Sequence, residues 1–290
     1  MFAIAGVTGN TGKVVADALL NQNQPVRVIV RDGAKGAPWA ARGAEVAVAD
    51  LEDAAALEEA LRSAEGAYLL IPPPGTGAAG VLDRARRLTA SFKQAIERSG
   101  VRHVVILSSV GAERPDSGIV KALYHLEREL GGLKTPITFL RAGYFIENWA
   151  GSLPPVLQAG VLPTFLLPDR PTTMIATKDI GLFAARALLE PPRRHQILDL
   201  AGPKEYRPTD VAKALTKLLG KPVAAQGQPL GEMVSTLTSF GFSAEMAELF
   251  RELTAGLNDG RIKAGGGRLI RGATTVEEVL DPIVRAASRG

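Results

Sequence analysis

Residues 1–145 alternate two patterns, and this alternation limits the fold more than any other feature of the sequence. Short runs of β-branched and other apolar residues alternate with segments whose apolar residues recur at helical spacing. Such alternation is typical of a parallel sheet covered by helices on both faces. Because the crossovers are right-handed, we predict an α/β fold with a doubly wound parallel sheet, a Rossmann fold. The expected strands are 2–7, 26–30, 45–49, 67–71, 103–108 and 137–140, and the expected helices are 12–20, 53–64, 81–98 and 119–130.

The pattern changes after Gly143, and clustered prolines between residues 154 and 171 indicate loops and short elements. We expect a Rossmann domain over residues 1–150 and a smaller α/β lobe over residues 151–290, which is interleaved with the sheet edge and is not independent. Within this lobe we expect helices at 179–189, 208–219, 243–255 and 275–287, a strand at 196–201 and a flexible turn at 265–267.

Composition excludes several classes of function. The chain has no cysteine, which excludes disulfides, thiolate metal sites and a cysteine nucleophile. The three histidines lack the spacing of a metal site, so we predict no metal. The net charge of +4 comes from scattered residues, which argues against a nucleic-acid partner. We find neither a secretory leader nor an apolar stretch of about 18 residues, so we expect a cytoplasmic protein without a membrane partner.

A glycine-rich turn, Gly6-Val7-Thr8-Gly9-Asn10-Thr11-Gly12, follows the first expected strand and opens the first expected helix. Glycines let the chain turn tightly and let backbone amides approach a pyrophosphate at the helix N-terminus. This strand–turn–helix setting favours a dinucleotide site over a turn without a ligand. The turn is not a P-loop, because no Gly-Lys-Ser/Thr follows it. The residues of the turn expected to bind the cofactor are Gly6, Thr8, Gly9, Asn10, Thr11 and Gly12.

The second expected strand ends at Arg31-Asp32, which bears on the choice of nucleotide. An acidic residue at this place would bind the adenosine ribose of NAD, whereas a guanidinium suits the 2′-phosphate of NADP. Arg31 comes first and Lys35 is close, so we predict NADP(H), with NAD(H) as the alternative because Asp32 could face the ribose. Arg31 could instead form a surface ion pair.

Two further strand ends lie on the expected ligand side of the sheet. Asp50 and Leu51 follow the third strand, where we expect contact with the adenine, although Asp50 could instead cap the next helix. Ile71, Pro72 and Pro73 end the fourth strand, where the backbone is expected to line the nucleotide crevice.

The Gly-x-x-Gly-x-x-Gly spacing resembles that of the extended and atypical short-chain dehydrogenase/reductases. With the downstream segments, the chain resembles the NmrA-like family of this superfamily over nearly its whole length. The matching segments are 6–12, 30–32 with Lys35, 49–51, 107–109, 125–127, 140–148 and 176–181.

Among its members, the chain looks most like the bacterial NADPH:quinone oxidoreductases and the azo- and triphenylmethane-dye reductases. This resemblance implies hydride transfer from NADPH to a planar, quinone-like small molecule. It also implies that Gly143, Tyr144, Phe145 and Asn148 lie in a loop near the nicotinamide. Tyr144, Phe145 and Trp149 could form an aromatic wall for the acceptor or could simply pack in a core.

The catalytic pattern departs from the Ser and Tyr-x-x-x-Lys of ordinary short-chain dehydrogenases. Ser108 ends the fifth expected strand, and Tyr124 shares a helix face with Arg128 in place of the lysine. His125 begins a His-x-Glu run like that of the similar quinone reductases and could donate a proton or orient the nicotinamide. It could equally be a helix histidine without a role. We therefore predict Ser108, Tyr124 and His125 as catalytic candidates, and expect His103 and His195 to be structural or surface residues.

Three functions compete on these observations. The first is an NADPH-dependent oxidoreductase acting on planar acceptors, in which positioning supplies most of the catalysis. The second is a catalytically silent NADP(H)-binding redox sensor, as the resemblance implies for the regulator that names the family. The third is a sugar-nucleotide epimerase, which the missing Tyr-x-x-x-Lys argues against.

Overall fold

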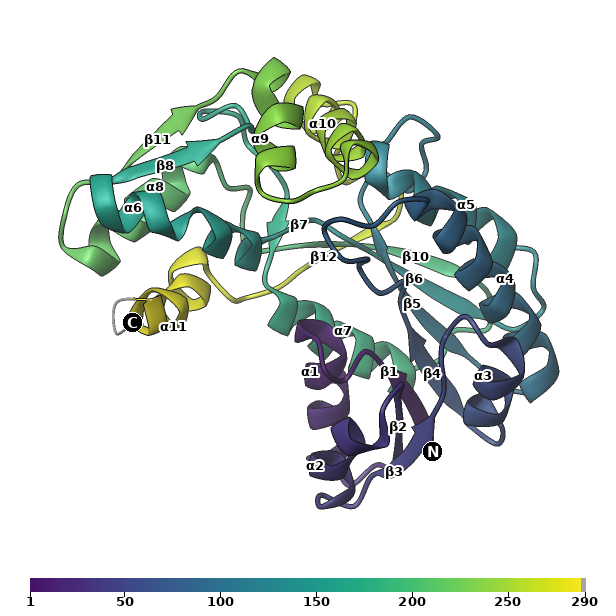
Figure 1. Ribbon diagram of the computed structural model, residues 1–290. Coiled ribbons are helices and arrows are strands. Elements are labelled where there is room, and N and C mark those ends of the chain that lie inside the picture. Colours follow the sequence, from purple (N-terminus) through teal and green to yellow (C-terminus); the bar gives the residue numbers. More distant parts are fainter. Residues whose placement is uncertain (288–290) are drawn as a thin grey trace.

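The computed structural model describes residues 1–287 and is built on one large parallel sheet of eight strands (Figure 1). The strand order β12-β10-β6-β5-β4-β1-β2-β3 reverses direction between β1 and β4, as in a doubly wound sheet. All its strand pairs are parallel, which confirms the predicted fold class. The strands are β1 (Phe2–Ala5), β2 (Val26–Val30), β3 (Glu45–Val48), β4 (Gly66–Leu69), β5 (Val104–Ser109), β6 (Ile137–Ala142), β10 (Gln196–Ala201) and β12 (Arg268–Arg271).

Helices cover both faces of this sheet, because alternate residues of its apolar strands point to opposite sides. Val105 faces the layer that includes α1 and α7, whereas Ile106 faces the layer that includes α3, α4 and α5. Each layer encloses an apolar core (Figure 1). The helices are α1 (Asn10–Leu20), α2 (Ala37–Ala40) and α7 (Thr177–Leu189) on one face, and α3 (Ala54–Leu61), α4 (Val81–Ser99) and α5 (Lys121–Leu130) on the other.

Most of the described chain after Gly143, apart from α7, β10 and β12, forms a lobe above the carboxyl ends of the strands (Figure 1). Its separate apolar core includes Trp149, Val156, Leu215 and Leu280. Two small parallel sheets, β7 with β9 and β8 with β11, belong to this lobe. Its elements are β7 (Tyr144–Phe145), η3 (Ile146–Ser152), α6 (Leu153–Ala159), β8 (Val161–Thr164), β9 (Met174–Ile175), α8 (Pro208–Leu219), β11 (Ala224–Gly227), α9 (Met233–Ser239), α10 (Ala244–Asp259) and α11 (Val276–Ala287).

Three hydrogen bonds join this lobe to the loop between β4 and α4. The backbone N–H of Ser243 donates to the carbonyl of Thr76 (2.9 Å), and the Ser243 hydroxyl donates to the carbonyl of Ala78 (2.7 Å). The Gly80 N–H donates to the Glu245 carboxylate (2.7 Å). Because these bonds join residues about 165 positions apart, they hold the start of α10 against the Rossmann half.

The glycine turn 265–267 is more ordered than the sequence suggests. The N–H groups of Gly265 and Gly267 donate to the buried carboxylate of Asp199 (2.7 and 3.0 Å). A Cβ on Gly266 would overlap the guanidinium of Arg141. The expectation of a flexible turn was therefore wrong, because these glycines let the backbone pack on buried charges. The short strands β8, β11 and β12 were missed, and within the described chain no helix is long and apolar enough to cross a membrane.

Candidate functional site

The glycine turn has the geometry that its sequence predicts. Gly6 has a φ of +70°, a conformation that favours glycine. A Cβ on Gly12 would lie 2.5 Å from the carbonyl oxygens of Ala5 and Gly6, so a glycine is needed for α1 to start this close to β1. Gly9 caps the helix, and its N–H donates back to the Gly6 carbonyl (2.9 Å).

The first amides of α1 are free to bind an anion. No side chain caps this end of the helix, and its first turn contains no acidic residue. Thr8, Gly9 and Asn10 are exposed, so an anion can approach the N–H groups at the start of this helix. Thr11 is buried, and its hydroxyl accepts a hydrogen bond from Tyr68 (2.9 Å). These residues fit the diphosphate of a dinucleotide.

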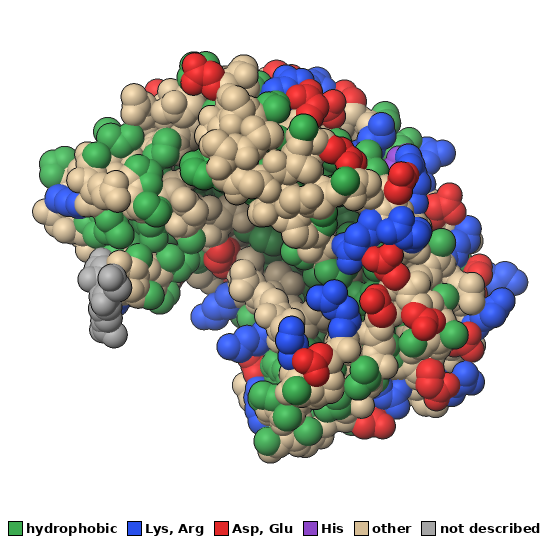
Figure 2. All heavy atoms as spheres, viewed as in Figure 1, with side chains coloured by type: hydrophobic (Ala, Val, Ile, Leu, Met, Phe, Trp, Pro, Cys, Tyr) green, Lys and Arg blue, Asp and Glu red, His purple; other side chains and the backbone are tan. Residues whose placement is uncertain are grey.

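Arg31 provides a free cation at the end of β2. Its side chain is exposed and forms no ion pair with any residue of 1–287, so the surface ion pair considered from the sequence is not observed. The carboxylate of Asp32 accepts the N–H of Ala34 (3.0 Å) and starts a 3₁₀ turn over Gly33–Gly36. Lys35 is exposed on the same turn. In the view of Figure 2, basic side chains gather along the lower rim of the recess between the lobes.

The other strand-end residues fall into two groups. Asp50 is exposed and accepts the N–H of Glu52 (2.9 Å), whereas the cap of α3 is Asp53, so Asp50 does not cap that helix. Leu51 is buried in the core. Because β4 ends at Leu69, the segment 71–73 lies in the following loop. There Ile71 and Pro72 are half-buried and Pro73 is exposed. The carbonyl of Pro72 accepts a hydrogen bond from Arg84 (3.0 Å). Contacts of these residues with a cofactor stay a prediction.

A large cavity of about 1450 Å³ opens where β5 and β6 end. Gly143, Tyr144, Phe145, Asn148 and Trp149 all line it, so the structure brings together the segment predicted to lie near the nicotinamide. The rings of Tyr144 and Trp149 pack 5.9 Å apart, and both residues also contact the lobe core. Burial raises the pKa of Tyr144 to about 12, partly offset by its hydrogen bond with Asn148, so its hydroxyl stays protonated.

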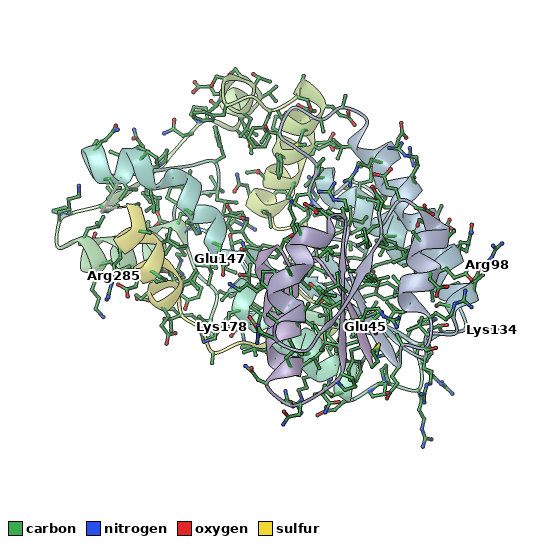
Figure 3. All side chains as sticks on the ribbon, turned by 60° about the horizontal axis from the view of Figure 1, so that its bottom comes forward. Glu45, Arg98, Lys134, Glu147, Lys178 and Arg285 are labelled. Carbon is green, nitrogen blue, oxygen red and sulfur yellow. The ribbon has the colours of Figure 1, made fainter. Side chains whose placement is uncertain are left out.

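Glu147 anchors this segment to the Rossmann half. Its carboxylate accepts the N–H and the hydroxyl of Thr177 (2.9 and 2.6 Å) and so caps the N-terminus of α7. Figure 3 shows Glu147 close to Lys178 at the joint between the two lobes. A Cβ on Gly143 would lie 2.6 Å from the Thr173 carbonyl, so this segment also fits tightly against β9.

The structure does not bring the three predicted catalytic residues to the cavity. Ser108 is buried and donates to Glu127 (2.6 Å), whereas its neighbour Ser109 lines the cavity. The physical reason is that successive strand residues point to opposite faces of a sheet. Sequence reasoning could have preferred Ser109 by following the alternation along β5.

Tyr124 and His125 lie on α5, which packs beside α4 on the Ser108 face of the sheet. The Tyr124 hydroxyl accepts a hydrogen bond from Arg128 (3.3 Å), and neither Tyr124 nor His125 is among the described residues that line the cavity. Burial and the positive charges of Arg86 and Lys121 lower the pKa of His125. Contact with the cofactor or acceptor therefore has no support in this geometry.

The other two histidines have structural roles, as expected. His103 is buried, with Nε2 3.0 Å from the Thr138 hydroxyl, and burial lowers its pKa to about 4. His195 accepts the N–H of Ile137 (3.1 Å), and its other ring nitrogen lies 2.9 Å from the Leu133 carbonyl. Across residues 1–287 no group of three potential metal ligands occurs.

Three phenylalanines of the α9–α10 region form a cavity wall that the sequence did not reveal. Phe240, Phe242 and Phe250 line the cavity, and the rings of Phe242 and Phe250 meet edge to face with centroids 5.9 Å apart. Phe240 is 71% exposed, which is unusual for a large apolar side chain. The only local hint was the pair of phenylalanines that flank Gly241.

The fold and site define a dinucleotide-binding α/β protein with a separate cavity for a second ligand. The chain belongs to the NmrA-like family, whose model matches residues 1–280. Similar curated proteins include quinone oxidoreductase 2 of Escherichia coli K12, 29% identical over 262 residues that cover 90% of this chain and 89% of the relative. The NAD(P)H azoreductase of Xenophilus azovorans is 26% identical over 264 residues that cover 88% of this chain and 86% of the relative.

Solved structures resemble the whole molecule. The NADPH-dependent quinone oxidoreductase of Escherichia coli in complex with NADPH has a TM-score of 0.81 and 26% identity, and the match covers 99% of this chain and 100% of that one. The Citrobacter triphenylmethane reductase complexed with NADP(H) has a TM-score of 0.83 at 20% identity over 98% and 100% of the two chains, which is a likeness of fold.

Proposed function

We propose that this protein is an NADPH-dependent oxidoreductase that reduces quinone-like or other planar acceptors. The observation that carries the proposal is the aromatic cavity of about 1450 Å³ at the carboxyl ends of β5 and β6, the edge of the parallel sheet at which β1 leads into the uncapped, glycine-built N-terminus of α1. Relatives named as quinone oxidoreductase and azoreductase over most of their length support the same activity. In this proposal residues 1–150 bind the cofactor and residues 151–290 form most of the acceptor side, and the cytoplasmic location expected from the sequence is retained.

Bound NADPH supplies the hydride, and the protein supplies binding and orientation. In the proposal the amides of α1 bind the diphosphate and Arg31 binds the 2′-phosphate. The segment 143–148, which Glu147 ties to α7, orients the nicotinamide toward the cavity. The hydroxyl of Tyr144 stays protonated and is available as a hydrogen-bond donor. Holding hydride and acceptor close together lowers the barrier without a dedicated acid–base pair.

A second candidate function is that of an NADP(H)-binding redox sensor without turnover. It is favoured by one observation: Tyr124 and His125 do not line the cavity, and α5 carries an arginine where ordinary short-chain dehydrogenases have lysine. The two candidates share the cofactor site and differ in whether the cavity accepts a hydride.

The test measures NADPH and NADH binding by calorimetry and NADPH oxidation with naphthoquinone, an azo dye and a triphenylmethane dye. We expect tighter binding of NADPH and turnover with at least one acceptor. Arg31→Ala should weaken NADPH binding by about 10- to 100-fold, the value of one charged hydrogen bond, and leave NADH binding unchanged. Lys134→Ala, whose side chain lies on the outer side of the molecule in Figure 3, is the matched control.

Failure to bind either dinucleotide would exclude both candidate functions. NADPH binding without turnover across the three acceptors would favour the sensor. Equal loss of NADPH and NADH affinity in Arg31→Ala would refute the role of Arg31 as the phosphate ligand.

A further inference from the structure

The acceptor cavity contains two cations that form no ion pair with an acidic side chain of residues 1–287. Arg170, between β8 and β9, is half-buried, and Lys263 follows α10. Both line the cavity. Within residues 1–287 neither side chain has a hydrogen bond or an ion pair with another side chain.

The two carboxylates of the same cavity have partners. Asp259 accepts Arg261 (2.7 Å), and its pKa is lowered chiefly by that hydrogen bond. Glu205 accepts the hydroxyl of Thr173 (3.1 Å) and lies 3.8 Å from Arg271. Neither Arg261 nor Arg271 lines the cavity. The charge of Arg170 also lowers the pKa of Asp259, but each carboxylate has an arginine outside the cavity as its ion-pair partner, whereas the two cations have none within residues 1–287.

A glycine fixes the position of the Arg170 guanidinium. Gly260 ends α10 with a φ of +80°, and a Cβ at this residue would overlap Nη2 of Arg170. The guanidinium therefore packs directly on the backbone of the turn that leads from Asp259 to Lys263. Arg170 therefore contacts the segment that carries Lys263, although the two residues are more than 90 positions apart in the sequence.

We propose that the acceptor is a planar molecule with an anionic substituent, a sulfonate, carboxylate or phosphate, which Arg170 and Lys263 bind. This inference rests on the proposed function and specifies its substrate class. The rings of Phe240, Phe242 and Phe250 provide apolar surface for the planar part. A partly buried guanidinium without a carboxylate partner suits an oxyanion, because its fork donates two parallel hydrogen bonds. Lys263 adds a second positive charge.

The activity test compares naphthoquinone with naphthoquinone sulfonate. For Arg170→Met and for Lys263→Met we expect kcat/KM to fall about tenfold with the sulfonate and less than about twofold with the neutral quinone. Arg170→Lys, which keeps the charge, should recover part of the loss. Lys217→Met on α8 removes an exposed lysine outside the cavity and should change neither value. The KM for NADPH should stay constant in all variants, which separates this site from the cofactor phosphates.

A binding test does not depend on turnover. Calorimetry on the protein saturated with NADP⁺ compares naphthalene sulfonate, naphthoate and naphthyl phosphate with neutral naphthol. We expect the anionic ligands to bind at least tenfold more tightly than naphthol, with the difference lost in the double variant Arg170→Met/Lys263→Met. The order of affinity among the three anionic ligands identifies the preferred anionic substituent.

The outcomes separate the two levels of the proposal. Turnover of both quinones at equal efficiency in the wild type and the variants would overturn the anion site and leave the oxidoreductase function intact. Absence of turnover with every acceptor would refute the oxidoreductase function, and the naphthalene ligands would still decide the anion site. Equal affinity for naphthol and the anionic ligands would overturn the proposed anion site.

Discussion

Replacing Arg141 by methionine tests whether the buried ion pairs beneath the cavity stabilise the fold. Arg141 is the next-to-last residue of β6 and is 5% exposed. Its Nε and Nη2 donate to the carboxylate of Glu127 (3.0 and 2.6 Å), and its Nη1 donates to Glu113 (2.9 Å). Glu127, with a side chain 8% exposed, also accepts the hydroxyl of Ser108. Arg141→Met keeps apolar bulk but leaves Glu127 buried with Ser108 as its remaining side-chain donor.

The magnitude follows from the burial of both partners. Removing one member of a buried ion pair leaves an uncompensated charge and costs about 3–5 kcal/mol. Unfolding entropy is about 2.1 cal/mol/K per residue, so this chain of 290 residues should lose about 5–8 °C in Tm. The loss of the Ser108 hydroxyl alone, in Ser108→Ala, should cost about 1.5–3 kcal/mol, because a hydrogen bond to a buried carboxylate disappears.

Urea unfolding at neutral pH and calorimetric Tm measure these losses. Arg186→Met, which removes an exposed i,i+4 pair with Glu190, is the matched control and should cost less than about 1 kcal/mol. The double variant Arg141→Met/Glu127→Gln should recover part of the loss, because the uncompensated carboxylate is gone. A loss in Arg141→Met no larger than in the Arg186 control, or a double variant less stable than the single one, would refute the reasoning.

The remaining predictions concern pH, the glycine turn and the aromatic wall. Burial lowers the pKa of His103 from 6.5 to about 4, so the unfolded chain takes up this proton first. The free energy of unfolding should therefore fall by up to about 3 kcal/mol as the pH drops from 6.5 to about 4. In urea unfolding, His103→Gln should show a shallower pH dependence than the wild type, and equal pH dependence of the two proteins would contradict this. Gly12→Ala should lower Tm and abolish NADPH binding, because the added Cβ would overlap two carbonyl groups. Gly9→Ala should fold normally, because the atom nearest to its added Cβ is 3.4 Å away. Equal Tm values for the two variants would count against the packing argument. Phe240→Ala should raise the acceptor KM several-fold and change stability by less than about 0.5 kcal/mol, because the side chain is 71% exposed; an unchanged KM would remove Phe240 from the acceptor site.

Much of the Rossmann half could be predicted because its signals are local. The expected helix over 81–98 is observed as Val81–Ser99, and the strand over 26–30 is observed with the same bounds. The lobe was less predictable. The lobe strands β8 and β11, and β12 at the edge of the large sheet, have four residues each. The proline in β8, the glycine in β11 and the arginines in β12 hide any strand pattern. They form because β10 and the small sheet offer partners that are distant in the sequence.

The sequence by itself determined the glycine-rich turn that leads into α1, because Gly6, Gly9 and Gly12 act through backbone geometry within a few residues. It also placed Arg31 at the end of β2. Only the tertiary structure decided which side chains reach the cavity. Ser109 lines it and Ser108 does not, since the two faces of β5 pack against different layers of helices. The cations and aromatic rings of the cavity come from segments remote in the sequence, and only packing of the lobe over the sheet brings them together.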